Sequence, residues 1–241
     1  MSNLSDVGFP VKSNEDVNGL VELWAKDVKE FPCEKGSYLV FFDASGVEIY
    51  LQMDLRGELL GFNPFFAGKT RHEISISQLI ERDTSEMDGG YVASFVNGNV
   101  PFVFDSPNIF ANRFEYPKRC EIQLNAFASN DLRVFENSEI FIKSQIAEPK
   151  IAVKSFAATG LHRHGDDIPP QAHAIFSGEV KKVERKTNVT SGENFYWLLI
   201  ETEIGEIDVV ADVNLFEIEP RVGIIIRGSF WLTGKITRLG E

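Results

Sequence analysis

Two Asp-x-x-Gly sequences, at residues 43–46 and 54–57, stand eleven positions apart in the first quarter of the chain. Each places a glycine where a tight turn requires a positive φ. Short apolar segments at 38–42, 47–53 and 58–62 alternate with these turns. The spacing therefore predicts a three-stranded antiparallel meander.

A helix is expected before this meander. Ser13 is a favourable capping residue, and acidic residues follow it in the first turn, where the helix dipole favours negative charge. Apolar residues then recur at helical spacing, at Val17, Leu20, Val21, Trp24 and Val28, and Pro32 follows. The pattern predicts an amphipathic helix of about four turns that packs on a sheet through Trp24.

Further strands are expected at 72–80, 90–96, 119–127 and 132–135. We expect the strand at 132–135 to form a hairpin with the strand before it, over a turn at 129–131. A short helix is expected at 138–146, with Ser138 as its cap. Residues 1–160 are thus predicted to form an antiparallel β-sheet domain with an N-terminal helix.

The composition changes to Gly, His, Asp and Pro between residues 159 and 170, which predicts a domain boundary there. Beyond it, strands are expected at 171–185, 193–203, 206–211 and 223–236, with room for a helical turn at 215–219. Both faces of 193–203 are apolar, so we expect this strand to be covered on both sides, one of them by the N-terminal part.

Glycines at 178, 228 and 234 lie inside these expected strands. A glycine within a strand is typical of a bulge or bend, and a bent strand can serve two sheets. This pattern resembles the OB-fold, a small five-stranded barrel, with the last segment split at Gly228 to supply the fifth strand. The fold class is therefore mainly β (α+β), with residues 171–241 as an OB-like small β-barrel domain.

The charge balance bears on location and partners. The chain has 24 Lys and Arg against 36 Asp and Glu, a net charge of −12, which disfavours nucleic acid and favours a basic protein partner. The first ten residues lack a signal-peptide pattern, and the longest apolar run, 38–42, is far too short to span a membrane. Cys33 and Cys120 have no paired spacing. We expect a cytoplasmic protein with reduced cysteines and no membrane partner.

A His-x-His-x-Asp sequence at His162, His164 and Asp166 carries the sharpest chemical signal. It resembles the first metal motif of the metallo-β-lactamase superfamily, which implies a divalent metal and a metal-dependent hydrolase. Asp167 stands where that motif has a further histidine, and the chain has too few expected helices for that fold. The alternative is a polar interdomain loop. Apart from this metal, no cofactor is predicted.

A basic group in the last third suggests a second alternative function. Lys181, Lys182 and Arg185 lead into the first loop of the expected barrel, and Tyr196 and Trp231 are aromatic residues on which bases stack in OB-folds that bind single strands. Against this alternative, residues 171–241 hold 8 basic and 11 acidic side chains.

The chain also resembles a family of uncharacterised bacterial proteins, in segments 62–68, 101–105, 205–212 and 228–232. This resemblance implies a bacterial origin and no particular chemistry. The serine-hydrolase, P-loop, dinucleotide-binding, zincin and EF-hand motifs do not occur. Catalysis is therefore not predicted, and the favoured interpretation is a non-catalytic binding or interaction module.

Overall fold

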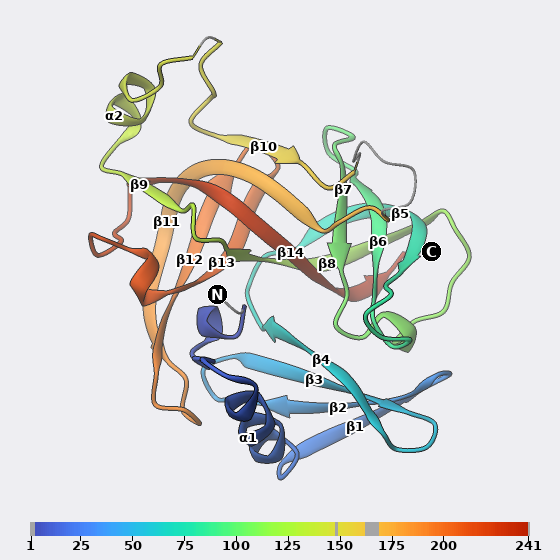
Figure 1. Cartoon of the computed structure of the whole chain (residues 1–241). Helices are drawn as coiled ribbons and strands as arrows, with labels where there is room; N and C mark the ends of the chain where they lie inside the picture. Colours follow the sequence, from blue (N-terminus) through green and yellow to red (C-terminus); the bar gives the residue numbers. More distant parts are fainter. Residues whose placement is uncertain (1–2, 148, 162–168, 241) are drawn as a thin grey trace.

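The computed structural model describes residues 3–147, 149–161 and 169–240. It consists of a four-stranded antiparallel sheet packed against a ten-stranded sheet that curls into a ring (Figure 1). The smaller sheet has the order β1 (Val28–Cys33), β2 (Gly36–Phe42), β3 (Val47–Asp54) and β4 (Leu59–Phe66).

The predicted meander is confirmed as β2, β3 and β4, which pair antiparallel in sequence order. Gly46 and Gly57 have φ of 99° and 79°, and each donates its N–H to the carbonyl oxygen of the aspartate three residues before it. One carboxylate oxygen of Asp54 also accepts the N–H groups of Arg56 and Glu58, both at 2.8 Å. These local contacts explain why the turns were readable from sequence.

The N-terminal helix begins where it was predicted and ends earlier. Helix α1 (Asn14–Trp24) has a capping box, because the Ser13 hydroxyl accepts the Asp16 N–H and the Asp16 carboxylate accepts the Ser13 N–H. The predicted continuation to Pro32 is wrong, since Val28–Cys33 forms strand β1 along β2. Hydrogen bonds to β2 outweigh the helical spacing of Val28.

The larger sheet contains every other strand of the described residues. Its order is β10 (Ser155–Ala158), β11 (His173–Thr187), β12 (Asn194–Thr202), β13 (Gly205–Asp212), β8 (Lys118–Ala128), β5 (His72–Glu81), β6 (Gly89–Phe95), β7 (Pro101–Asp105), β14 (Ile225–Leu239) and β9 (Arg133–Phe135). Two further pairings, β11 with β14 and β8 with β14, curl the sheet on itself.

These pairings make two closed circuits that share β8 and β14. One circuit runs through β11, β12, β13, β8 and β14, and the other through β8, β5, β6, β7 and β14. The fifth strand of the first circuit is therefore β8, and β14 continues through Gly228 without a break. The OB-like barrel made of residues 171–241 alone is not confirmed. The boundary predicted between residues 159 and 170 falls between β10 and β11, which are hydrogen-bonded to each other.

Two of the strand glycines allow close contact inside the ring. A Cβ atom at Gly178 would lie 2.5 Å from the carbonyl oxygen of Glu201, and one at Gly234 would lie 2.6 Å from the ring of Phe104. No side chain fits at such distances. Gly178 therefore lets β11 approach β12, and Gly234 lets β14 approach β7.

Strand β9 pairs with β14, and not with β8 as the predicted hairpin required. Helix α2 (Ser138–Lys143) follows, and its cap is Asn137 where Ser138 was expected. The described residues also form three short 3₁₀ turns: η1 (Ser5–Val7), η2 (Ile109–Ala111) and η3 (Val213–Leu215). The longest helix among the described residues is the 11-residue α1, so none of them has the roughly 20 apolar residues that a membrane crossing needs.

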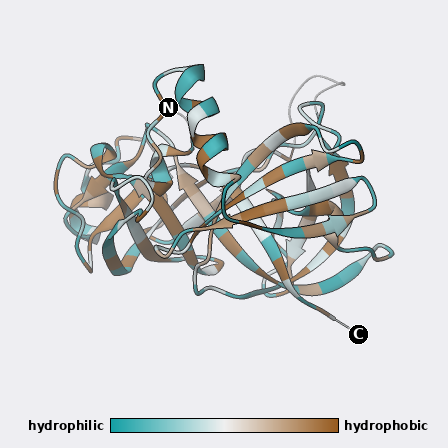
Figure 2. Ribbon diagram, turned by 90° about the horizontal axis from the view of Figure 1, so that it is seen from below, coloured by the Kyte–Doolittle hydropathy of each residue, from teal (hydrophilic) through white to brown (hydrophobic). Residues whose placement is uncertain are grey.

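Hydrophobic and hydrophilic residues alternate along the strands (Figure 2). Strand β12 is an exception to this alternation, because residues 195–200 are all apolar and both faces of the strand are buried. Tyr196, Leu198 and Ile200 face the core inside the ring, whereas Phe195, Trp197 and Leu199 face a second core shared with the four-stranded sheet. The predicted cover on both sides of this strand is confirmed.

Buried polar contacts fix the smaller sheet to the ring. Asp208 of β13 accepts four hydrogen bonds of 2.8 Å, from the N–H groups of Lys69 and Thr70, the Thr70 hydroxyl and the Trp197 indole. A Cβ at Gly68 would clash with this carboxylate. The segment that leaves β4 is therefore held against β13.

Candidate ligand-binding groove

The three residues of the predicted metal site, His162, His164 and Asp166, lie outside the described residues. The other two histidines are on strands, and His72 donates a 2.9 Å hydrogen bond from Nε2–H to the Glu206 carbonyl oxygen. Burial lowers the pKa of His72, which keeps its imidazole neutral. Elsewhere in the described part of the chain, no three His, Cys, Asp or Glu side chains gather in a way that could hold a metal.

The residues predicted to bind nucleic acid are spread over three strands, β11, β12 and β14. Lys181 forms ion pairs with Glu179 and Glu201, at 3.1 and 3.0 Å. Lys182 and Arg185 are exposed, and Arg185 lies opposite Tyr196. The Tyr196 side chain is buried in the ring and packs edge-on against a phenylalanine. It offers no open ring face to a base.

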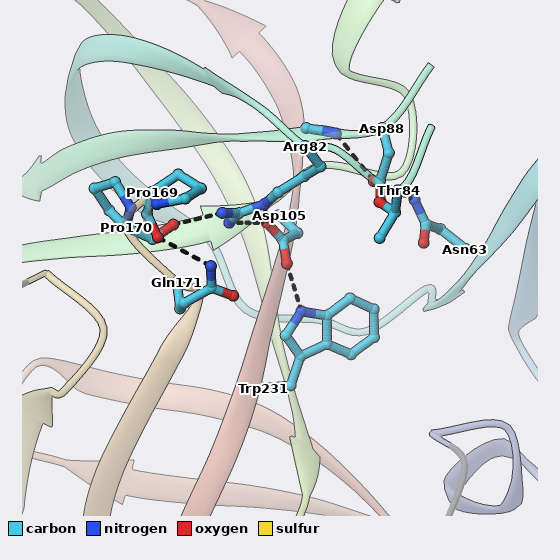
Figure 3. Close-up of polar contacts among 10 residues, drawn as sticks. Asn63, Arg82, Thr84, Asp88, Asp105, Pro169, Pro170, Gln171 and Trp231 are labelled. Carbon is cyan, nitrogen blue, oxygen red and sulfur yellow. Dashed lines mark hydrogen bonds and ion pairs between the residues drawn. The ribbon is translucent and has the colours of Figure 1, made fainter. Parts of the chain in front are cut away.

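Trp231, the fifth of these residues, belongs to a different polar cluster (Figure 3). Its indole N–H donates a 2.7 Å hydrogen bond to Asp105, whose other carboxylate oxygen forms an ion pair with Arg82. Arg82 also donates to the carbonyl oxygen of Pro170. Burial raises the pKa of Asp105, and the Arg82 charge and the Trp231 hydrogen bond oppose this rise. Both carboxylate oxygens of Asp105 therefore have partners within the cluster. The cluster links the end of β5 to β7 and β14.

A cleft of about 420 Å³ lies between the ends of β5, β8 and β14 and contains Cys120. Burial raises the pKa of the Cys120 thiol to about 11, so the thiol is protonated and a poor nucleophile at neutral pH. Charges of both signs line this cleft, and Arg238 pairs with Glu121. The mixed charges of this cleft therefore favour neither an anionic nor a cationic ligand.

Arg133 on β9 and Arg227 on β14 form a pair of like charges. Val134 and Ile226 face the core, so their neighbours Arg133 and Arg227 point to the outer face of the ring. The antiparallel register places Arg133 directly opposite Arg227. Cβ atoms at such positions are about 4.5–5.5 Å apart, and like charges placed there destabilise a sheet. Among the described residues, no acidic side chain forms an ion pair with either arginine.

An apolar hollow of about 370 Å³ adjoins this pair on the side of α2. Phe141 is buried beneath it and packs edge-on against Phe135, with 5.1 Å between ring centroids. The side-chain amide of Gln145 fixes the segment at Ile151, which also lines the hollow. It donates to the Ile151 carbonyl at 3.0 Å and accepts the Ile151 N–H at 2.6 Å. Ile146 also lines the hollow and is 99% exposed.

A second hollow of about 230 Å³ lies on the other side of the pair, lined by Asp131, Ile175 and Gly228 together with both arginines. The two oxygens of Asp131 accept the N–H and the hydroxyl of Ser229, at 2.9 and 2.7 Å. We call the two hollows and the arginines between them the arginine groove. It is defined by Arg133, Arg227, Phe135, Phe141, Ile146 and Ile175.

The arginine groove has the chemistry of an anion-binding site. Each guanidinium carries five N–H donors in a fixed plane, which match a carboxylate or phosphate in a bidentate manner. An anion between Arg133 and Arg227 would also remove the repulsion between them. The one carboxylate that lines the hollows among the described residues, Asp131, is already engaged with Ser229, so the groove can hold an anion but shows no free base or nucleophile.

Comparison with known proteins gives no guide to the role of this groove. No protein-family model matches the chain, and neither a curated protein nor a solved structure shows significant similarity to it.

Sequence reasoning did not single out Arg133 or Arg227. The one usable signal was alternation, since each arginine interrupts an apolar segment and so had to face outward. Nothing in the sequence indicated that the two segments pair.

Proposed function

We propose that the protein is a non-catalytic binding module and that the arginine groove holds an anionic group of its ligand. One observation carries the proposal: Arg133 and Arg227 face each other across neighbouring strands without an acidic partner among the described residues. A bound anion is the simplest compensation for such a pair.

The described residues that line the groove include no activated group, which supports binding over catalysis. General acid–base or nucleophilic chemistry requires a group of suitable pKa within reach of the ligand. The Ser144 hydroxyl, at the edge of the hollow, donates to the carbonyl of Phe141 at 2.8 Å, and both oxygens of Asp131 are engaged.

The net charge of −12 does not oppose a local anion site. Charges more than about 8 Å away are largely screened at physiological ionic strength, so the nearest groups dominate. The basic partner expected from the net charge stays a prediction for other faces of the molecule.

The test is an NMR titration of ¹⁵N-labelled protein with sodium acetate, with sodium chloride keeping the ionic strength constant. We expect saturating shifts in the amide signals of β9, α2 and the first half of β14, and their loss in Arg227→Gln. Shifts that do not saturate, or that persist in this variant, would contradict the proposal.

Single-strand binding and a metal-dependent hydrolase stay the alternatives. Binding of a labelled oligothymidylate at low salt, where phosphate contacts are strongest, would favour the first. Saturable zinc or manganese binding by the full chain would favour the second. A cytoplasmic location belongs to the proposal too, and the two free cysteines are compatible with a reducing compartment.

A further inference from the structure

We infer that the anionic group bound in the arginine groove is an acidic side chain within an extended peptide, with apolar side chains two residues before and after it. This inference rests on the proposed function and specifies the ligand. The position of the arginine pair carries it, because a hollow lies on each side of the pair. A free inorganic anion would use neither hollow.

The spacing of the groove matches that of a peptide. Along β14, three residues follow one another at two-residue intervals: Ile225 lies opposite Phe135 of the first hollow, Arg227 lies opposite Arg133, and Ser229 is hydrogen-bonded to Asp131 of the second hollow. Two residues of an extended strand span about 6.6–6.8 Å, and side chains at i−2, i and i+2 of an extended peptide point the same way at the same interval. A peptide lying along β14 therefore places three side chains over three successive sites.

The linings of the two hollows determine the flanking residues. Phe135, Phe141 and Ile146 give the first hollow an apolar lining, and its 370 Å³ accommodates a large aliphatic or aromatic side chain. The second hollow is smaller, and its apolar wall is Ile175, which is 36% exposed. A smaller aliphatic side chain fits there.

Charge determines the central residue. Two guanidinium groups that have no acidic partner among the described residues favour a carboxylate, and hydrogen bonds between charged groups are roughly twice as strong as neutral ones. A peptide with lysine at the centre would meet repulsion, and one with glutamine would lose the charge but keep the shape.

Three fluorescein-labelled pentapeptides test the inference by fluorescence anisotropy with the full chain. Each has leucine at both ends and glycine at positions two and four, and the central residue is glutamate, glutamine or lysine. We expect the glutamate peptide to bind at least about tenfold more tightly than the glutamine peptide, which corresponds to about 1.4 kcal/mol, and the lysine peptide not to bind. Arg133→Gln and Arg227→Gln should each abolish this preference, whereas Arg56→Gln, an exposed arginine on the β3–β4 turn, should preserve it.

Equal binding of the glutamate and glutamine peptides would overturn the inference. So would a glutamate peptide that binds no more tightly than acetate does in the NMR titration, and in that case the anion site would stand while its peptide ligand would not. If neither acetate nor the peptide binds, both the inference and the proposed function fail. A fourth peptide with alanine at both ends tests the hollows separately, and its affinity should fall.

Discussion

The backbone N–H of Asp212 donates a 2.9 Å hydrogen bond to the buried carboxyl group of Asp6, which anchors the first turn of the chain to the end of β13. Burial raises the pKa of Asp6 to about 8; the hydrogen bond from Asp212 opposes the rise, and the nearby Asp212 charge adds to it. Asp6 is therefore largely protonated in the folded protein at neutral pH.

This pKa makes stability depend on pH with a definite sign. Between about pH 4 and pH 8 the folded protein keeps the Asp6 proton and the unfolded chain releases it. The stabilisation from this group is complete below pH 4 and is lost as the pH rises to 8. Asp6→Asn keeps an acceptor for the Asp212 N–H and removes the titration, so urea unfolding at pH 5, 7 and 9 should show a flatter profile than wild type. The exposed Asp83→Asn serves as control, and an unchanged profile in Asp6→Asn would contradict the assignment.

Asp208 should contribute strongly to stability. Asp208→Ala leaves the N–H groups of Lys69 and Thr70 and the indole of Trp197 without their acceptor. The Thr70 N–H and the Trp197 indole are buried, and each orphaned buried donor costs about 1–3 kcal/mol, so the free energy of unfolding should fall by at least about 2 kcal/mol. Urea denaturation measures this free energy, with Asp83→Ala as control. A loss below about 1 kcal/mol would mean that the attachment of the smaller sheet does not depend on the hydrogen bonds to Asp208.

The ion pair in Figure 3 allows a test that separates the cost of a lone buried charge from the value of the pair. Asp105→Asn leaves the mostly buried Arg82 charge without its counter-ion, which typically costs about 3–5 kcal/mol. The double variant Arg82→Met/Asp105→Leu removes both charges and should lose less than Asp105→Asn alone. If the double variant is the less stable of the two, the pair itself stabilises the junction of β5 and β7.

The opposed arginines predict a gain in stability when one is removed. In a buffer without carboxylate or multivalent anions, Arg133→Gln should raise the free energy of unfolding by about 0.2–1 kcal/mol, because a like-charge cross-strand pair disappears. Arg56→Gln changes the net charge equally on an exposed turn and should show no such gain. A loss of stability in Arg133→Gln would mean that the two guanidinium groups do not repel each other in the folded protein.

Local signals account for the parts of the fold that the sequence predicted. The Asp43 and Asp54 turns and the Ser13 cap each depend on contacts within a few residues. Strand β1 was missed because its stability comes from β2, while Trp24 and Val28 continue the helical spacing. The pattern of turns and alternating residues could not show which distant strands pair.

The site illustrates this limit most clearly. Arg133 and Arg227 are far apart in the sequence and become neighbours only because β9 pairs with β14. The hairpin expected for residues 132–135 would have placed Arg133 beside β8 and away from Arg227. Gly228 and Gly234 were correctly placed in a long strand, but the partner β8 that completes the circuit comes from the middle of the chain, before the predicted domain boundary.

The most direct measurement is the free energy of unfolding as a function of acetate concentration at constant ionic strength, for wild type and for Arg133→Gln/Arg227→Gln. A ligand that binds only the folded state adds RT ln(1 + [L]/Kd), so wild type should gain about 1.4 kcal/mol at an acetate concentration ten times Kd. The double variant should show no gain beyond that in chloride. Parallel curves for the two proteins would contradict anion binding by the arginine pair.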